Sequence, residues 1–109
     1  MSLPLCQNFI AGAWTPSSAA SPTTPVFNPS TGETIAACPV GTTADAEAAI
    51  AAAAAAFHAW SETPPVDRAR VFFRYRHLVE QNFDRLTALI SREHGKTLVE
   101  SRGDVKRGM

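Results

Sequence analysis

The chain has 109 residues, of which 45% are hydrophobic, a composition typical of a folded domain rather than of a disordered segment. Ten basic and ten acidic residues cancel, which argues against a long-range field that would attract nucleic acid or an anionic membrane. The two cysteines, Cys6 and Cys38, are too few for a disulfide framework and lack metal-ligand spacing, so we expect reduced thiols and a cytoplasmic protein. No secretory signal and no membrane-spanning stretch are expected either.

The first forty residues have the pattern of short strands and turns. In residues 8–15, apolar residues flank Ala11-Gly12, which predicts a tight hairpin or a short strand pair. Residues 16–25 are rich in Ser, Thr, Ala and Pro without an apolar period, which predicts a surface loop. A cluster of turn formers at 28–33 follows, so residues 26–28 are expected to pair with residues 34–38.

The pattern becomes helical after Gly41. Thr42 and Asp45 form a capping-box pattern, which predicts the amino terminus of a helix. Apolar residues then recur at intervals of three and four as far as Trp60, and the many alanines raise the helix propensity. The prolines at 64 and 65 are expected to end this helix.

Two more helices are predicted between residues 65 and 95. The first has Pro65 in its first turn and is apolar around more than half of its circumference, so it needs partners on two sides. Asn82 is placed to cap the second, which carries Phe83, Leu86, Leu89 and Ile90. Gly95 is expected to close it in the left-handed conformation.

A fourth helix is expected to start after Thr97 and to include Leu98 and Val105. Its pattern has no stop signal before Gly108, and the sequence ends one residue later. A helical pattern that stops in this way predicts a chain that is part of a larger domain.

No pattern in the chain assembles a catalytic, cofactor-binding or metal site, and we predict none. His58, His77 and His94 fall on three different predicted helices, so each is expected to have a structural role. Neither Cys6 nor Cys38 has a cation, a base or a helix amino terminus beside it to activate a thiol, so neither is expected to be a nucleophile.

Two charged clusters have simple structural interpretations. Residues 93–96 offer an acid, a base and a cation, but Gly95 ends a helix there, and phosphate binding would need a helix amino terminus. Four arginines are interspersed with acidic residues and point to different helical faces, which predicts a solvated, partly paired surface rather than a nucleic-acid site. These arginines are Arg68, Arg70, Arg74 and Arg76.

Six segments, taken in order, resemble the opening of the aldehyde dehydrogenase superfamily. They are residues 8–14 (NFIAGAW), 28–35 (NPSTGETI), 56–60 (AFHAW), 68–70 (RAR), 93–97 (EHGKT) and 103–105 (GDV). The resemblance extends from about Asn8 to Met109. It implies an α+β fragment of an α/β fold, with hairpins at about 8–40 and three to four helices at about 42–109. Residues 1–109 would then form the amino-terminal part of the NAD-binding domain, without the Rossmann-like sheet and without the catalytic and oligomerisation domains.

Within that superfamily, residues 92–97 and 103–108 are similar to the methylmalonate-semialdehyde branch. The branch implies NAD-dependent oxidation of methylmalonate semialdehyde and malonate semialdehyde to an acyl-CoA, with CoA as the acceptor and a cysteine thiolate as the nucleophile. The residues for these steps belong to later family segments, so this chain is expected to be a catalytically inactive scaffold. The alternatives are a succinate-semialdehyde or betaine-aldehyde type of dehydrogenase, and a non-catalytic helical interaction module.

The resemblance also has a physical consequence. The faces formed by Phe72 and Phe73 and by Phe83, Leu86 and Ile90 would normally lie against a parallel sheet that these residues do not contain. Exposing them costs several kcal/mol at about 25 cal/mol per Å² of apolar surface. We therefore expect the 109 residues to self-associate through their helices or to rearrange, with no cofactor, nucleic acid or membrane bound to them.

Overall fold

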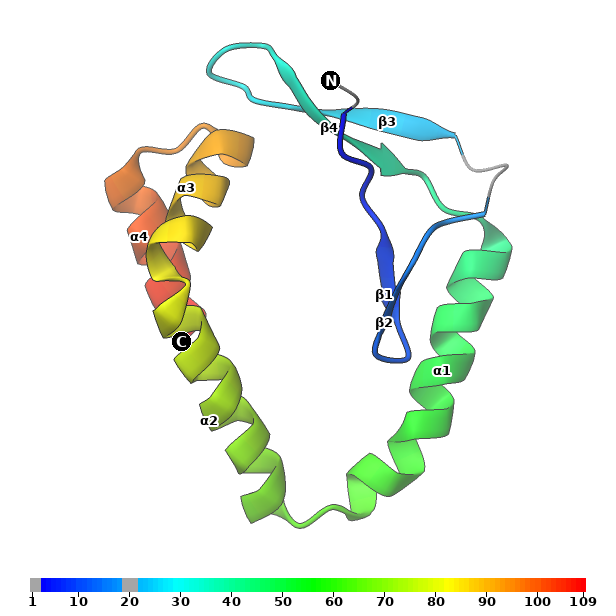
Figure 1. Ribbon diagram of the computed structural model, residues 1–109. Coiled ribbons are helices and arrows are strands. Elements are labelled where there is room, and N and C mark those ends of the chain that lie inside the picture. The colour runs from blue at the N-terminus through cyan, green and yellow to red at the C-terminus, as the bar shows by residue number, and fades with distance from the viewer. Residues whose placement is uncertain (1–2, 19–21) are drawn as a thin grey trace. The chain divides into compact units, whose positions relative to one another are not determined.

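A computed structural model describes residues 3–18 and 22–109, which form two antiparallel hairpins followed by four helices (Figure 1). This is the predicted fold class. The chain divides into two compact units. The first contains the residues up to Phe27 together with residues 34–62, and the second contains residues 28–33 together with residues 63–109.

The first hairpin joins β1 (Asn8–Ile10) to β2 (Ala13–Thr15), as the sequence predicts. Ala11 and Gly12 form its two-residue turn with φ angles of 51° and 80°, and positive φ at both positions suits the twist of a tight hairpin. Phe9 lies opposite Trp14, and their ring centroids are 4.9 Å apart. This cross-strand aromatic pair stabilises the hairpin, whose register is fixed by its two-residue turn.

The second hairpin pairs β3 (Thr23–Phe27) with β4 (Thr34–Pro39). The predicted pairing is present, but the prediction of a loop at 16–25 is wrong for residues 23–25; residues 19–21 lie outside the described part of the chain. Pro25 is tolerated because β3 is an edge strand, where a missing N–H breaks no ladder bond on the open side. A register shift between Val26 and Phe27 leaves Ile35 as an extra residue of β4, and that side chain is buried.

A third segment adds to the free edge of β4, which the sequence did not indicate. Leu5 forms a parallel bridge with Ala37. The N–H of Cys6 donates to the carbonyl of Ala37 over 2.8 Å, and the N–H of Ala37 donates to the carbonyl of Pro4 over 3.0 Å. The segment near residue 5 is therefore held to β4 by two backbone hydrogen bonds, one to the carbonyl and one from the N–H of Ala37.

Helix α1 (Thr43–Glu62) begins where the Thr42 and Asp45 pattern predicts and ends two residues after Trp60. The N–H of Thr42 donates to the Asp45 carboxylate over 2.8 Å, and the N–H of Asp45 donates to the Thr42 hydroxyl over 3.2 Å. These two reciprocal bonds confirm the capping box. The helix contacts β1, but no residue of α1 is buried.

The second unit contains α2 (Pro65–Gln81), α3 (Phe83–His94) and α4 (Leu98–Arg107). Pro65 occupies the first helical turn, as predicted. The prediction that the Asn82 side chain caps α3 is wrong, because it donates instead to the carbonyl of Leu78 over 2.9 Å. Asn82 connects two helices directly, and both its backbone N–H and its side-chain amide donate to the carbonyl of Leu78 at the end of α2.

Gly95 ends α3 with a φ of 78°, which confirms the left-handed cap. The turn at residues 28–33 packs here, and an added Cβ on Gly95 would lie 2.9 Å from the Cγ of Pro29. That turn is held by the Ser30 N–H, which donates to the Asn28 side chain, and by the Asn28 N–H, which donates to the carbonyl of Glu33. The glycine is therefore required for both its backbone conformation and the close approach of Pro29.

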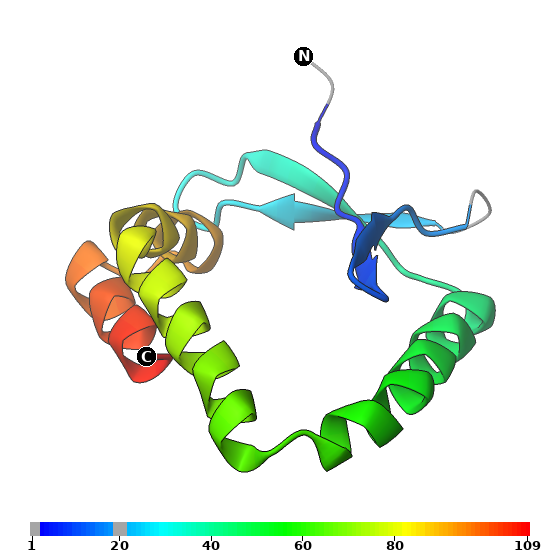
Figure 2. The same ribbon diagram turned by 60° about the horizontal axis from the view of Figure 1, so that its bottom comes forward.

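Helices α3 and α4 lie side by side in both ribbon views (Figure 2). The buried residues of these two helices are Thr87 on α3 and Ser101 and Val105 on α4. Helix α2 contacts α3 but has no buried residue of its own. Within the described residues, no helix has the length and apolar character needed to cross a bilayer.

Candidate functional site

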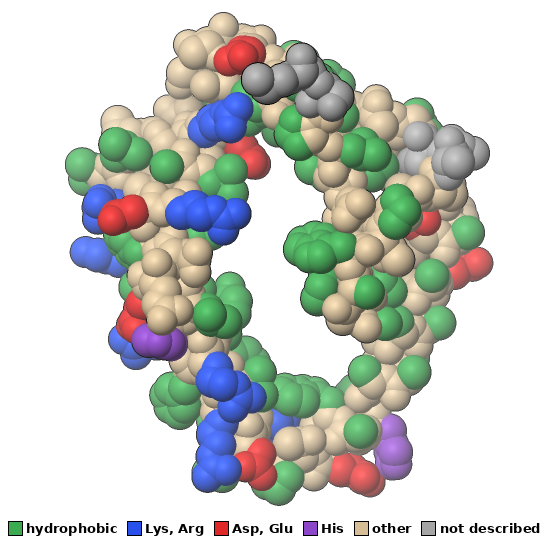
Figure 3. Space-filling view, in the orientation of Figure 1, with side chains coloured by type: hydrophobic (Ala, Val, Ile, Leu, Met, Phe, Trp, Pro, Cys, Tyr) green, Lys and Arg blue, Asp and Glu red, His purple; other side chains and the backbone are tan. Residues whose placement is uncertain are grey.

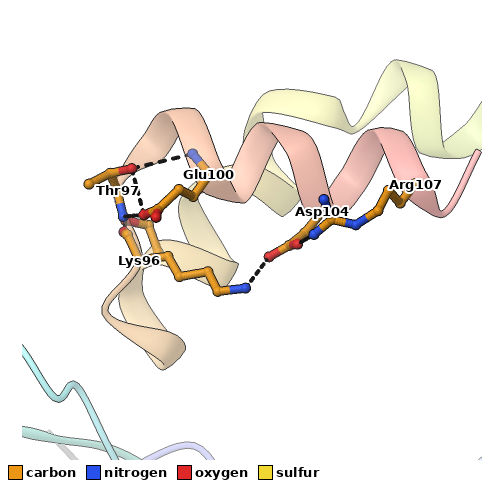
Figure 4. A network of polar contacts seen from close by, with 6 residues as sticks. Lys96, Thr97, Glu100, Asp104 and Arg107 are labelled. Atoms are coloured by element: carbon orange, nitrogen blue, oxygen red, sulfur yellow. Dashed lines mark hydrogen bonds and ion pairs between the residues drawn. The ribbon is translucent and has the colours of Figure 1, made fainter.

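A network of polar side chains lies where α3 passes into α4 in the second unit (Figure 4). The Lys96 ammonium donates to the Asp104 carboxylate over 2.8 Å, and both side chains are partly shielded from solvent. Arg107 forms an ion pair with the other carboxylate oxygen of Asp104. Ser91 donates to the Lys96 carbonyl over 2.6 Å. Every charge in the cluster is paired within the chain, so the cluster orders the helix junction and presents no reactive group.

The amino terminus of α4 lies beside this cluster. The N–H and hydroxyl of Thr97 both donate to the Glu100 carboxylate, over 3.0 and 2.8 Å, and the Glu100 N–H donates to the Thr97 hydroxyl over 3.3 Å. The Thr97 hydroxyl and N–H lower the pKa of Glu100, with smaller contributions from the charges of Lys96 and His94. This capping box gives the helix a negative charge of its own at its positive end.

The amino terminus of α1 in the first unit has a similar arrangement. The Asp45 carboxylate accepts from the Ser17 hydroxyl over 2.6 Å, the Thr42 N–H over 2.8 Å and the Thr42 hydroxyl over 2.9 Å. These bonds, that of Ser17 first, lower the pKa of Asp45. The carboxylate therefore stays ionised at neutral pH and occupies the end of the helix where an anionic ligand would bind.

These caps test whether the described residues fit a dinucleotide such as NAD. Its pyrophosphate needs a helix amino terminus whose N–H groups and positive dipole end are available. In the residues that the structure describes, each helix has an acidic residue in its first turn: Asp45, Asp67, Asp84 and Glu100. The carboxylates of Asp45 and Glu100 already accept the hydrogen bonds of the capping boxes. A dinucleotide pyrophosphate does not fit these helix ends.

The three histidines lie apart from one another. His58 is 3.7 Å from Glu62 on the exposed surface of α1, and His77 contacts Gln81 on α2. His94 lies in the last turn of α3. Among residues 3–18 and 22–109, no group of histidine, cysteine and acidic side chains has the arrangement of a metal site.

The four arginines of α2 form a mixed surface. Arg70 pairs with Asp67 over 2.8 Å, and Arg76 pairs with Glu80 over 3.0 Å, both on the exposed side of the helix. Arg68 is half-buried, and Arg74 lines an apolar recess on the same helix. Exposed pairs of this kind contribute little to stability. The exposed pairs of Arg70 and Arg76 match the predicted solvated, partly paired surface, whereas the Nε of Arg68 is buried.

Exposed apolar surface distinguishes this chain more than any polar group. In the first unit, a groove of about 560 Å³ lies between β1 and the start of α1 and contains Ile10, Val40 and Ala49. A neighbouring hollow of about 240 Å³ continues along the alanines of α1. On α2, Phe72 and Phe73 are 64% and 69% exposed. Hydrophobic side chains are correspondingly visible on the helices in the space-filling view (Figure 3).

These surfaces expose mainly apolar atoms. The recess on α2 is lined by Phe73, Arg74, His77 and Leu78 and has a volume of about 450 Å³. Contiguous exposed apolar patches on a protein surface mark places where other protein segments pack. The sequence predicted the apolar faces of α2, and the groove beside β1 could have been anticipated from the alanine run, which lets another backbone approach α1 closely.

Comparison with known proteins gives matches over most of the chain. The model of the aldehyde dehydrogenase family matches residues 14–109. Malonate-semialdehyde dehydrogenase of Pseudomonas aeruginosa is 52% identical over 84 residues, which are 77% of this chain and 17% of that protein. The enzyme of the same name from Bacillus pumilus is 41% identical over 105 residues, which are 96% of this chain and 21% of that protein.

Solved structures give the same picture. A Sinorhizobium meliloti protein, assigned as a methylmalonate-semialdehyde dehydrogenase and complexed with NAD, superposes with a TM-score of 0.92 at 36% identity over 98% of this chain. Succinate-semialdehyde dehydrogenase of Burkholderia pseudomallei superposes with a TM-score of 0.87 at 34% identity over 93% of this chain. The 109 residues span about a fifth of the length of these proteins, 22% and 21% respectively.

Proposed function

Because the chain belongs to the aldehyde dehydrogenase family, we propose that its 109 residues are the amino-terminal part of the NAD-binding domain of a malonate- or methylmalonate-semialdehyde dehydrogenase. The similarity to malonate-semialdehyde dehydrogenases along almost the whole chain carries this proposal. Residues 8–40 and 42–109 supply the hairpins and helices of that domain. The catalytic and oligomerisation domains belong to the remaining four-fifths of the length that such relatives have.

In this proposal the complete enzyme oxidises the semialdehyde with NAD and transfers the acyl group to CoA. The residues described here hold none of the reacting groups. Lys96, Asp104 and Arg107 are paired with one another, and the Glu100 carboxylate is engaged by Thr97. Their role is to hold the junction of α3 and α4 in one geometry. The enzyme is proposed to be oligomeric and cytoplasmic.

The exposed apolar faces are where the rest of the dehydrogenase would pack. Phe72 and Phe73 project from α2, and no residue of that helix is buried. Burial of a phenylalanine side chain contributes about 1.5–3 kcal/mol, so covering this pair contributes about 3–6 kcal/mol. A contribution of that size is comparable with the total stability of a small domain. Packing between this region and the rest of the enzyme therefore stabilises both.

Without that cover, the same faces are proposed to drive self-association of the 109-residue chain through its helices. Sedimentation velocity of this chain is expected to show concentration-dependent oligomers, and a hydrophobic dye is expected to bind. A dilute, stable monomer that binds no dye would contradict the assignment of these faces to packing.

The activity is tested on the enzyme translated from the complete reading frame. NADH formation is expected with malonate semialdehyde and methylmalonate semialdehyde, and the rate is expected to depend on CoA. Acyl-CoA, identified by mass spectrometry, is the expected product. A CoA-independent rate with release of the free acid would contradict the acceptor, and preference for succinate semialdehyde would favour the second candidate below. The 109-residue chain alone is expected to show no turnover.

The second candidate is a succinate-semialdehyde dehydrogenase with water as the acceptor. The similarity to the Burkholderia pseudomallei enzyme favours it. The substrate panel above separates the two candidates, because each predicts a different preferred semialdehyde and a different response to CoA.

A further inference from the structure

The only two cysteines of the chain are brought together by the short parallel bridge in the first unit. Cys6 follows Leu5 and Cys38 follows Ala37, and Leu5 and Ala37 are the bridged pair. Moving one residue along both strands from a parallel bridge gives the next facing pair. Cys6 therefore faces Cys38, although 31 other residues separate them in the sequence.

The backbone hydrogen bonds hold this pairing tightly. The Cys6 N–H donates to the carbonyl of Ala37 over 2.8 Å, and that carbonyl belongs to the peptide group preceding Cys38. Neighbouring strands lie about 4.8 Å apart. Disulfides form between residues whose Cα atoms lie about 4.4–6.8 Å apart, so the backbone separation suits a bond.

The two side chains also lie on the same face. Successive side chains of a strand point to opposite faces, so Cys6 and Cys38 both lie on the face opposite Leu5 and Ala37. Both cysteines are thiols in this structure; Cys6 is exposed and Cys38 is half-buried. An exposed thiol beside a second, shielded thiol is the arrangement of an oxidisable cysteine and its resolving partner.

We propose that Cys6 and Cys38, which the sequence alone did not predict to be nucleophiles, are a redox-active pair that hydrogen peroxide converts into an intramolecular disulfide. The Cys6 thiolate attacks one peroxide oxygen, the O–O bond breaks and a sulfenic acid forms; the hydroxide that leaves takes up a proton, equivalent to the one lost by the thiol, to form water. The Cys38 thiolate then attacks the sulfenic sulfur, the S–O bond breaks, and the hydroxide that leaves takes a proton to form a second water. The two thiols lose two electrons and two protons, and the peroxide is reduced to two waters. The bond ties the amino-terminal segment covalently to β4.

The pair is tested by treating the protein with hydrogen peroxide and cleaving it, without reductant, after acidic residues. Glu33 is the only acidic residue between the two cysteines, so cleavage there separates them unless a disulfide joins them. Mass spectrometry is expected to detect a fragment linking Cys6 to Cys38, lighter than the two thiols by two hydrogen atoms and cleaved by dithiothreitol. The link is expected to form at least about tenfold faster than in urea-denatured protein, because folding holds the thiols within reach.

A matched control moves one thiol to the opposite face of the strand. In the double variant C6S/Q7C the new cysteine is adjacent in sequence but points away from Cys38, and Gln7 is exposed, so the fold should tolerate the change. This variant is expected to lose the rate advantage of the folded state. The proposal is overturned if the wild-type protein forms only intermolecular disulfides or separate sulfinic acids. It is also overturned if the C6S/Q7C variant or the denatured protein forms the link as fast as the folded wild-type protein.

Discussion

Replacing Gly95 by alanine tests how the turn at residues 28–33 is held in the second unit. Gly95 has a φ of 78°, which costs an L-residue such as alanine about 1–2 kcal/mol. The new Cβ would also lie 2.9 Å from the Cγ of Pro29, inside van der Waals contact with a ring that cannot rotate away. Overpacking of this kind costs about 1–3 kcal/mol, so the Gly95→Ala substitution is expected to destabilise the unit by about 2–5 kcal/mol.

A double-mutant cycle with Pro29→Ala separates the two effects. In the Pro29→Ala background the Cγ is absent, so Gly95→Ala is expected to cost only the backbone strain of about 1–2 kcal/mol. Urea unfolding followed by circular dichroism gives the free energies of the four proteins. Hydrogen exchange of the α3 and α4 amides shows whether the loss lies in the second unit. A Gly95→Ala cost that is equal in both backgrounds would refute the contact with Pro29.

Three further predictions concern the caps and the apolar surface. Thr97→Ala removes the hydroxyl that accepts from the Glu100 N–H and donates to the Glu100 carboxylate, and is expected to destabilise α4 by about 1 kcal/mol in urea unfolding. Thr97→Ser keeps this hydroxyl and serves as the matched control. Because the pKa of Glu100 is lowered in the folded state, that state binds fewer protons than the unfolded state near the ordinary glutamate pKa. The free energy of unfolding is therefore expected to decrease as the pH falls from about 5 through the lower folded pKa of Glu100. In Glu100→Gln the free energy of unfolding is expected to depend less on pH. The same pH dependence in both proteins would count against the cap. Phe73→Ser is expected to reduce dye binding and self-association of the 109-residue chain while its helical circular dichroism is kept, and unchanged association would exclude this face as the contact.

The sequence alone predicted the features that depend on neighbouring residues. The capping pattern of Thr42 and Asp45, the proline at the start of α2 and the left-handed Gly95 each act within one helical turn. Their hydrogen bonds and φ angles follow from residue types a few positions apart, so a linear pattern is enough to locate them. The family resemblance also predicted the order of the hairpins and helices along the chain.

Side-chain roles at the helix junctions were harder to predict. Asn82 has the residue type of an amino-terminal cap, yet its side-chain amide donates to the carbonyl of Leu78 at the end of α2, and its side chain forms no cap hydrogen bond with α3. Residues 23–25 have the composition of a loop, yet they form part of β3 because β4 offers a ladder of hydrogen bonds. The partner of residues 23–25 lies in another strand, outside the local pattern, whereas Asn82 has two competing roles within its own neighbourhood.

What the sequence determined by itself is the type and order of the elements, because helix periodicity, caps and tight turns are set by contacts within about four residues. Only the tertiary structure decided that Pro29 packs on Gly95, that Lys96 reaches Asp104 and that Cys6 faces Cys38. These pairs are 66, 8 and 32 positions apart in the chain. Composition and periodicity carry no information about which distant residues meet, since that depends on how the backbone folds back on itself.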